Sequence, residues 1–318
     1  MRPDGNDFAE DSGLEDPGCP GPGGEADLGS PSDGRARSFA PGDTSPPGLV
    51  GDQGSPAGDR AFAPSSLTLT AGRDKSGRPE ATGITFRPGE ITALLGPTGS
   101  GKSRFLSDIE SLACGDTPTG RMLLIDGRAP DPDERFALQG RLVAQLTQNM
   151  NFVLDLGARE FVKLHAMSRE VEDPEGAAER VLEAANALAG ERFGPATQLT
   201  QLSGGQSRAL MIADTALLSW SPVLLIDEIE NAGVDKRKAL DLLLKSDKII
   251  VMATHDPVLA LSADRRLVFE HGAVKLVQTR TGGEETLLAR LSDMEEELSR
   301  VRGMLRAGRE FRGSGEMG

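Results

Sequence analysis

The sequence predicts an α/β protein with a largely parallel sheet, and three observations support this fold class. Short apolar stretches alternate with helical stretches from about residue 65 to residue 278. Such alternation is typical of parallel sheets that are covered by helices. Two of the apolar stretches, residues 223–226 and 249–253, contain no polar residue, as expected for central strands that are buried on both faces. Residues from about 155 to 200 carry helical patterns without a strand between them, which indicates a helical insert in this core.

The elements follow in order along this region. Two segments of the insert are predicted helices, residues 157–167 and 174–190. Pro174 lies near the start of the second segment and Gly190 near its end, where helices favour these residue types. The strand candidates are residues 91–95, 122–125, 142–146, 223–226 and 249–253.

Residues 1–64 differ in composition from the rest of the chain. Residues 1–60 contain 13 Gly, 9 Pro, 12 acidic and 4 basic residues, so they carry 4 − 12 = −8 of the net charge of −14. Such a segment cannot bury enough apolar surface to offset the entropy lost on ordering. We expect a disordered acidic arm whose simplest role is to aid solubility. It also lacks the basic start and apolar core of a secretory signal.

Composition excludes several classes of function. The two cysteines, Cys19 and Cys114, have no metal-ligand spacing and form no disulfide framework, which fits a reducing cytoplasm. No nucleic-acid partner is expected, because phosphate neutralisation needs clustered Lys and Arg. No apolar run reaches the roughly 18–20 residues that span a bilayer. A membrane partner would therefore have to be a separate chain.

The stretch "GPTGSGKS" predicts a phosphate-binding loop, because it fits G-x-x-x-x-G-K-[ST] between an apolar strand and a helix. Glycines let the backbone fold around phosphates with its N–H groups pointing inward. The side chain of Lys102 is expected to reach the β- and γ-phosphates, and the Ser103 hydroxyl to ligate Mg²⁺. The predicted nucleotide-binding residues here are Gly96, Pro97, Thr98, Gly99, Ser100, Gly101, Lys102 and Ser103.

The stretch "VLLIDE" predicts the metal-binding and water-activating end of the same site. An apolar strand delivers Asp227 to the carboxyl edge of the sheet, where ligands bind in open parallel sheets. Asp227 is the candidate metal ligand. The next carboxylate, Glu228, is the candidate for orienting and polarising the attacking water.

With "LSGGQ" at residues 202–206, the chain resembles the nucleotide-binding domains of ATP-binding-cassette (ABC) proteins over about residues 67–278. The stretch "RLVAQLTQNMNFV" resembles the family's Q-loop, with Gln148 as the candidate glutamine and Gln145 as the alternative. The stretch "VMATHD" resembles the switch region, with His255 in the histidine position. The resemblance implies a P-loop NTPase fold. This fold has a mostly parallel central sheet, a small antiparallel β portion and a helical insert, about residues 155–203, that carries the signature motif.

The resemblance also implies a mechanism. Two such domains face each other head to tail and hold two ATP molecules with Mg²⁺ between them. Gln148 would complete the metal and water shell, and His255 would contact the γ-phosphate. His165 and His271 lack a comparable context and are expected to be structural or surface residues. The signature residues that would touch the nucleotide of the partner subunit are Ser203, Gly204, Gly205 and Gln206.

Three departures from the family pattern stand out. The segment "TAGRDKSGRPEATG" lacks the aromatic residue that usually stacks on adenine, and Arg73 is a candidate substitute. The helix after the signature has Asp214 where a basic residue is usual. The segment after Glu228 reads "IENAGVD" instead of a Pro-Thr sequence, so residues 231–235 are expected to serve as the D-loop.

The last segment predicts a coiled-coil helix. We divide the chain into an acidic arm (1–64), a nucleotide-binding domain (65–281) and this C-terminal helix with its tail (282–318). The helix could pack on its own domain, pair with a second copy, or bind a partner helix. Its apolar residues repeat at spacings of 4, 3, 4, 3 and 4, as in a coiled-coil seam: Leu287, Leu291, Met294, Leu298, Val301 and Leu305.

The sequence leaves two functions open. The first is the ATP-hydrolysing subunit of an ABC transporter, in the cytoplasm or at the inner face of the cell membrane, with separate transmembrane chains. The second is a soluble ABC-type ATPase without a membrane partner, which the departures near Glu228, the acidic arm and the C-terminal helix favour. A nucleotide-binding regulator without turnover is less consistent with the presence of Glu228, Gln148 and His255.

Overall fold

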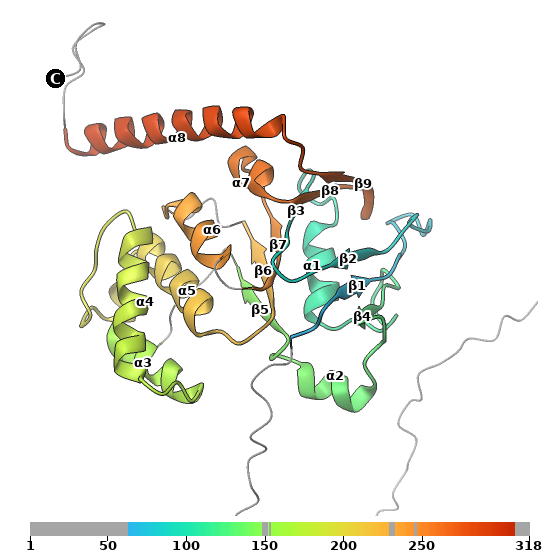
Figure 1. The fold of residues 1–318 in the computed structure, drawn as a ribbon, viewed down its shortest axis with the longest axis horizontal. Coiled ribbons are helices and arrows are strands. Elements are labelled where there is room, and N and C mark those ends of the chain that lie inside the picture. The colour runs from blue at the N-terminus through green and yellow to red at the C-terminus, as the bar shows by residue number, and fades with distance from the viewer. Residues whose placement is uncertain (1–62, 148–151, 153, 229–232, 245–246, 309–318) are drawn as a thin grey trace, which may run out of the picture. The chain divides into compact units, whose positions relative to one another are not determined.

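The computed structural model of this chain describes residues 63–147, 152, 154–228, 233–244 and 247–308. The predicted fold class is confirmed, since a mostly parallel six-stranded sheet lies beside a small antiparallel one (Figure 1). The large sheet has the order β5-β6-β7-β3-β8-β9, in which only β9 pairs antiparallel. Its strands are β3 (Ile91–Leu95), β5 (Val143–Leu146), β6 (Val223–Asp227), β7 (Ile249–Ala253), β8 (Arg265–Glu270) and β9 (Ala273–Thr279).

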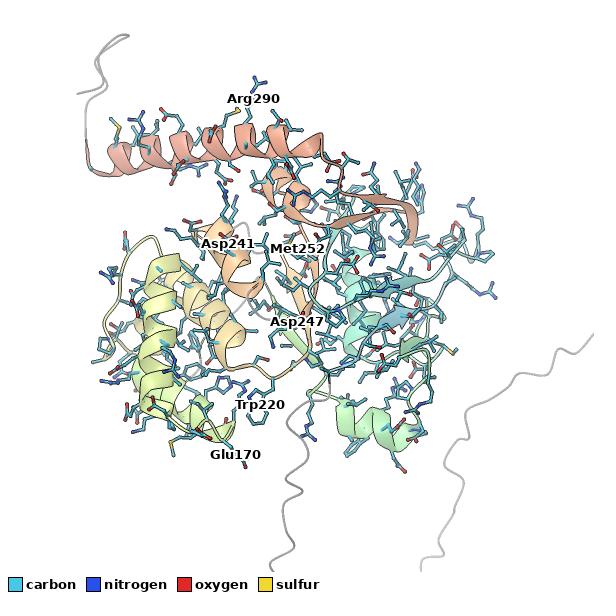
Figure 2. All side chains as sticks on the ribbon, viewed as in Figure 1. Glu170, Trp220, Asp241, Asp247, Met252 and Arg290 are labelled. Carbon is cyan, nitrogen blue, oxygen red and sulfur yellow. The ribbon has the colours of Figure 1, made fainter. Side chains whose placement is uncertain are left out.

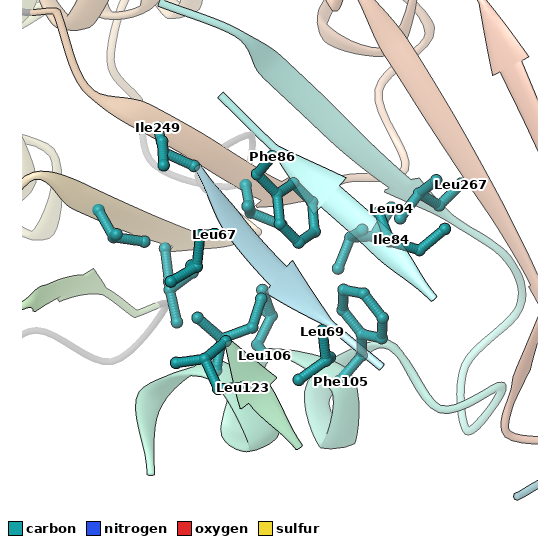
Figure 3. Packing of buried hydrophobic residues seen from close by; sticks show 14 of the residues in the cluster. Leu67, Leu69, Ile84, Phe86, Leu94, Phe105, Leu106, Leu123, Ile249 and Leu267 are labelled. Atoms are coloured by element: carbon teal, nitrogen blue, oxygen red, sulfur yellow. The ribbon is translucent and has the colours of Figure 1, made fainter. Parts of the chain in front are cut away.

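The small sheet has the order β2-β1-β4, with β1 (Leu67–Leu69), β2 (Ile84–Phe86) and β4 (Leu123–Ile125). Helix α1 (Lys102–Glu110) packs near both sheets through Phe105 and Leu106, which are buried together with residues of β1 and β2 (Figure 3). The ring of Phe105 meets the rings of Phe86 and Phe269 edge to face, at centroid distances of 6.2 and 5.1 Å. The helix that follows the predicted phosphate loop is therefore held in a well-packed core.

The helical insert has its own core. Helices α3 (Ala158–Ser168) and α4 (Pro174–Leu188) lie within one or two residues of the predicted segments and pack on α5 (Gly204–Leu218). Small residues make their contact close, because Ala158, Ala166, Ala178 and Ala185 are fully buried. A short 3-10 turn, η1 (Leu199–Gln201), leads into α5.

The other face of the large sheet is covered by α5, α6 (Lys236–Leu244) and α7 (Pro257–Ser262), which contribute Ile212, Leu240 and Leu259 to a second apolar cluster. Helix α2 (Pro132–Leu138) lies in the connection from β4 to β5. Helix α8 (Glu284–Arg306) packs on α7 near its own start (Figure 1). None of the helices in the described part of the chain combines the length and apolar character needed to cross a membrane.

Candidate nucleotide-binding site

The predicted site lies at the carboxyl ends of three adjacent strands. Strand β7 pairs with β3 on one side and with β6 on the other, so Ala253 is opposite both Leu94 and Asp227. The phosphate loop follows β3, Asp227 ends β6 with Glu228 directly after it, and His255 follows β7. Residues that lie far apart in the sequence therefore converge at one sheet edge, the usual ligand position of open parallel sheets.

The loop from Gly96 to Gly101 adopts a conformation that depends on glycine. Gly99 and Gly101 have φ angles of 76° and 113°, which side-chain-bearing residues rarely adopt. A Cβ on Gly101 would also lie 2.7 Å from the Cα of Gly272. Pro97, Thr98 and Gly99 are exposed, so the outer rim of the loop is open to a ligand.

The interior of the loop suits an anion. Lys102 is 6% exposed, and its ammonium donates to the carbonyl oxygens of Gly96 (2.6 Å) and Pro97 (3.2 Å). The Ser100 hydroxyl is buried and has no hydrogen-bond partner among the described atoms. The N-cap of α1 is Gly101, which has no side chain to cap the first turn. The N–H groups in the first turn of α1, and the positive end of this helix, are therefore available to a phosphate.

Two distant segments support the outside of the loop, and sequence reasoning missed both. The N–H of Gly272, in the turn between β8 and β9, donates to the carbonyl of Ser100 (2.8 Å). The ammonium of Lys75 donates to the carbonyl of Gly99 (2.7 Å), and its backbone N–H donates to His271 (2.9 Å). No local motif could have predicted these contacts, because they join residues that are far apart in the sequence.

A buried charge cluster links α1 to this turn. Arg121 is 1% exposed and donates to Asp108 of α1 (2.9 Å), to both oxygens of Glu80 (2.7 and 2.9 Å), and to the carbonyl of Gly272 (3.2 Å). Its guanidinium also lies 5.1 Å from the ring centroid of Phe105. Burial alone would lower the pKa of Arg121, but hydrogen bonds to Glu80 and Asp108 raise it overall. We name Arg121, Glu80 and Asp108 the buried charge cluster.

The acidic end of the site is less enclosed. Glu228 has a φ of 50° and its N–H donates to the carbonyl of Ala253 (3.0 Å), which turns the chain sharply at the end of β6. Its Oε1 lies 3.2 Å from Nε2 of His255, and the two side chains are 30% and 45% exposed. The predicted carboxylate and histidine therefore contact each other. Each comes just after one member of the register pair Asp227 and Ala253, at the ends of β6 and β7.

The signature segment begins α5 with a reciprocal cap. The hydroxyl of Ser203 accepts from the N–H of Gln206 (3.3 Å), and the side-chain oxygen of Gln206 accepts from the N–H of Ser203 (2.9 Å). The amide nitrogen of Gln206 donates to the carbonyl of Glu191 (3.3 Å). Gln206 thus serves the cap, while Ser203, Gly204 and Gly205 lie at the helix start with Ser203 and Gly204 exposed.

The candidates for the Q-loop, the D-loop and adenine stacking lie partly outside the described part of the chain. Gln148 and Asn231 lie outside the described residues, and the alternative Gln145 lies within β5 opposite Leu225. Asp235 donates its N–H to Leu188 at the end of α4 (3.0 Å). A guanidinium nitrogen of Arg73 lies 3.3 Å from the carbonyl of Gly77, within its own hairpin.

Asp214, a departure from the family pattern, has a structural explanation. It is 2% exposed, and its carboxylate lies 2.8 Å from Nδ1 of His165 on α3. Arg169 lies 2.9 Å from the same ring nitrogen. His165 therefore joins α3 of the insert to α5 through Asp214, as expected for a structural residue.

A pocket on the surface of the insert lies apart from this edge of the sheet. It is lined by residues of α3 and α4 and of the segment 195–198, among them Lys163, Glu175 and Ala196. The chemistry of the phosphate loop, and not the size of a pocket, therefore locates the candidate site.

Comparison with known proteins shows similarity to ATP-binding proteins of ABC transporters. A family model described as ABC transporter matches residues 80–231. The uncharacterized ABC transporter ATP-binding protein MJ0121 of Methanocaldococcus jannaschii is 45% identical over 243 residues, which cover 76% of this chain and 93% of that protein. The macrolide export ATP-binding/permease protein MacB of Brucella abortus is 32% identical over 204 residues, or 60% of this chain. This chain spans only 30% of MacB.

Solved structures give the same fold. The dimeric post-hydrolysis ATP-binding cassette MJ0796 bound to ADP and Pi is 27% identical, with a TM-score of 0.52, and the match covers 68% of this chain and 99% of that one. The cbiO1 protein of Clostridium perfringens, part of the ABC transporter complex cbiONQ, is 22% identical with a TM-score of 0.51, and the match covers 76% of this chain and 98% of that one. The second match supports the fold alone.

Proposed function

We propose that this chain, which belongs to the ABC transporter family of ATP-binding proteins, energises a transporter whose membrane-crossing chains are separate polypeptides. Members of this family are ATPases, and the chain is an ABC-type ATPase. The observation that supports the proposal best is the convergence of the phosphate loop, Asp227, Glu228 and His255 at three adjacent strand ends. We place the nucleotide-binding unit at residues 65–281, with its helical part at about 155–203.

The phosphate loop would bind the nucleotide. Lys102 would exchange its carbonyl partners for the β- and γ-phosphates, with the N–H groups of the loop and of the first turn of α1 as further donors. The inward orientation of Lys102 and the uncapped start of α1 support this role. A phosphate chain at this position fits the residues present.

Mg²⁺ fits the oxygen ligands of this edge. Ser103 would offer its hydroxyl and Asp227 its carboxylate, the hard oxygen donors that Mg²⁺ prefers; Gln148 is a further candidate. When bound, the ion supplies charge neutralisation to the β- and γ-phosphates. Glu228 would orient and polarise the attacking water, and His255 would hold the carboxylate and contact the γ-phosphate. The 3.2 Å separation of Glu228 and His255 supports their joint action.

A second copy would complete the site. In a head-to-tail dimer, Ser203, Gly204 and Gly205 of one subunit would contact the γ-phosphate that is bound by the other. The exposure of Ser203 and Gly204 at the start of α5 supports this arrangement, because a helix N-terminus attracts anions. The cap does not prevent it, since the Ser203 hydroxyl accepts from Gln206 and still has its hydrogen to donate.

The role of Glu228 is tested by Glu228→Gln. ATP binding should remain, because the phosphate loop is unchanged, while turnover should fall by about 10²–10⁴-fold with the loss of the general base. Glu270→Gln is a matched control, since Glu270 is an exposed carboxylate paired with Lys275. Nucleotide binding by fluorescence titration and phosphate release are measured for both. Hydrolysis at the parental rate in Glu228→Gln would refute the assignment.

Transport is tested separately from hydrolysis. We expect the chain to co-purify with polytopic membrane proteins from detergent-solubilised membranes, and to be found at the inner face of the cell membrane. The alternative, a soluble ABC-type ATPase, is favoured by Asp214 of α5, which stands where a basic residue is usual and pairs with His165. Recovery only from the soluble fraction, with full ATPase activity, would establish that alternative instead.

A further inference from the structure

An apolar stripe runs along one side of α8. Leu287, Met294, Leu298 and Leu305 are 49%, 55%, 53% and 59% exposed, and Leu291 and Val301 of the same stripe are half-buried. Large apolar side chains that are scattered over a surface need no explanation. Here they share one side of a single helix at the spacing of a coiled-coil seam, which does need one.

The stripe is not the face that attaches α8 to its own domain. Glu284 binds Arg266 through both oxygens (2.7 Å each), Ser292 is 6% exposed, and Glu295 binds Lys236 at the start of α6 (2.8 Å). Since an α-helix has 3.6 residues per turn, these attachments lie about a quarter turn from the stripe. They also lie in the first half of α8, and Figure 1 shows the second half extending beyond α7.

The charges beside the stripe indicate what covers it. Leu291, Leu298 and Leu305 occupy position a of a heptad, and Leu287, Met294 and Val301 occupy position d. Positions e and g flank the seam and set orientation and partner choice. Arg290 and Glu297 occupy g, and each is followed by an e residue of opposite charge, Glu295 and Arg302.

In a parallel pair of identical helices, g of one helix faces the following e of the other. Arg290 would then face Glu295 of the second copy, and Glu297 would face Arg302 of the second copy. Both pairs are attractive, and symmetry doubles them. In an antiparallel pair that buries the whole stripe, the two copies of Glu295 would meet near the centre, as would the two copies of Glu297, and these contacts repel.

Glu295 already binds Lys236 of its own domain through Oε1 (2.8 Å), so Arg290 of the second copy would meet its other oxygen. The present partners of the other charges do not oppose the pairing. Glu297 binds Arg300 one turn along the same helix (2.6 Å), with side chains 58% and 45% exposed, and such surface pairs contribute little. Arg290 points away from α7 (Figure 2). A twofold axis parallel to α8 would place the attached faces of the two helices on opposite sides of the helix pair.

We propose that two copies of this chain associate through their α8 helices as a parallel coiled coil, independently of ATP. This interface is isologous and self-complementary, as in most symmetric dimers. It is distinct from the head-to-tail contact that nucleotide would create, because its residues lie on α8 and not at the phosphate loop or the signature.

The first test measures the mass of the full chain without nucleotide by sedimentation velocity over a concentration series. We expect a concentration-dependent dimer that persists in Lys102→Ala, in which the nucleotide sandwich cannot form. Leu298→Asp should shift it to monomer, while Glu296→Arg, an exposed change on the same helix outside positions a, d, e and g, should not. A monomer at every concentration, or a dimer unchanged by Leu298→Asp, would overturn the proposal.

The second test determines the orientation by oxidative cross-linking of full chains that lack Cys19 and Cys114. Leu305→Cys should form a disulfide between copies, because equal a positions face each other only in the parallel form. Glu296→Cys, on the outer side of the helix, should not. Failure of Leu305→Cys to cross-link in a chain that is dimeric by mass would overturn the parallel arrangement.

The third test exchanges a predicted charge pair. Glu297→Arg and Arg302→Glu should each raise the dimer dissociation constant, and the double variant should restore it towards the parental value. Circular dichroism of each variant checks that α8 still forms. Additive weakening in the double variant would overturn the predicted contact of Glu297 with Arg302.

Discussion

Helices α1 and α5 both begin at glycine-rich motifs, yet their first turns differ. The start of α1 is capped by Gly101 alone, and its surroundings are rigidly built, with a buried charge cluster and two distant carbonyl contacts. The start of α5 is closed by Ser203 and Gln206, and its outer side is open. The first turn of α1 has no side-chain cap, so its N–H groups can donate to an anion. In the first turn of α5, the reciprocal cap already gives hydrogen-bond partners to the N–H groups of Ser203 and Gln206.

This difference fits a division of labour. A loop that must hold a nucleotide in one subunit benefits from preorganised donors, which the rigid surroundings of α1 supply. In the proposed head-to-tail dimer, the start of α5 would meet that nucleotide only when a second subunit arrives, so it must be stable on its own. The reciprocal cap of α5 provides that stability and would leave a hydroxyl hydrogen for a phosphate in the proposed dimer.

The largest expected effect comes from removing the charge that supports α1. Arg121→Met leaves Glu80 and Asp108 buried without their partner, and it should lower the free energy of unfolding by about 3–5 kcal/mol. Arg78→Met is the control, because its pair with Asp74 is on the surface with Arg78 71% exposed, and it should cost at most about 1 kcal/mol. Urea unfolding measures both. Equal effects would mean that the buried cluster does not support α1.

The same cluster predicts sensitivity to acid. Burial by itself would raise the pKa of Glu80, but hydrogen bonds from Arg121 and Val274 bring it below its usual 4.5. The folded state therefore binds fewer protons than the unfolded state near that pH. This contribution is complete above pH 4.5 and is lost as the pH falls through the folded-state pKa. Unfolding by urea at a series of pH values should show a shallower acid slope in Arg121→Met than in the parent.

A pair of glycine substitutions compares the two helix starts directly. Gly101→Ala forces a φ of 113° on a residue with a side chain, and its Cβ would lie 2.7 Å from Gly272, so a loss of about 1–3 kcal/mol is expected. Gly204→Ala meets nothing within 4 Å in a helical turn, and it should stabilise by up to about 1 kcal/mol. Thermal unfolding checks both changes. The reverse order would refute the contrast between the two starts.

The smallest expected effect on stability comes from Ser203, and its variants separate helix capping from the proposed contact with the nucleotide. Ser203→Ala removes the cap and should cost about 1 kcal/mol. Ser203→Asp keeps a capping oxygen and should retain the stability, but its negative charge would repel the γ-phosphate of the partner subunit. We therefore expect normal unfolding with low ATPase activity. Parental activity in Ser203→Asp would contradict a role for Ser203 at the nucleotide.

Local patterns explain which elements could be predicted. The buried strand at 249–253 has the bounds expected from its apolar run, since a strand buried on both faces is a continuous apolar stretch. Strands β1 and β2 have three residues each, too few for any period to show. Strand β9 is mostly exposed, so no apolar run indicates it.

The residues of the site also divide into those that a local pattern predicts and those that it does not. The phosphate loop, Asp227, Glu228 and His255 belong to local motifs, and the structure brings them to one sheet edge. No motif assigns a role to Arg121, Lys75 or Gly272, because their importance comes from contacts with residues far along the chain. Asp214 could be recognised as unusual, but its partner His165 is 49 residues away and carried no signal of its own.

The contact between Gly272 and Ser100 also has a consequence for the order of synthesis. Ser100 leaves the ribosome 272 − 100 = 172 residues before the turn that fixes its carbonyl. At about 5–20 residues per second, the phosphate loop waits roughly 10–35 s for that turn to be made. During this interval the nascent chain carries a complete nucleotide motif without its final shape, so ATP should be unable to stabilise the growing chain until β8 and the turn after it have emerged.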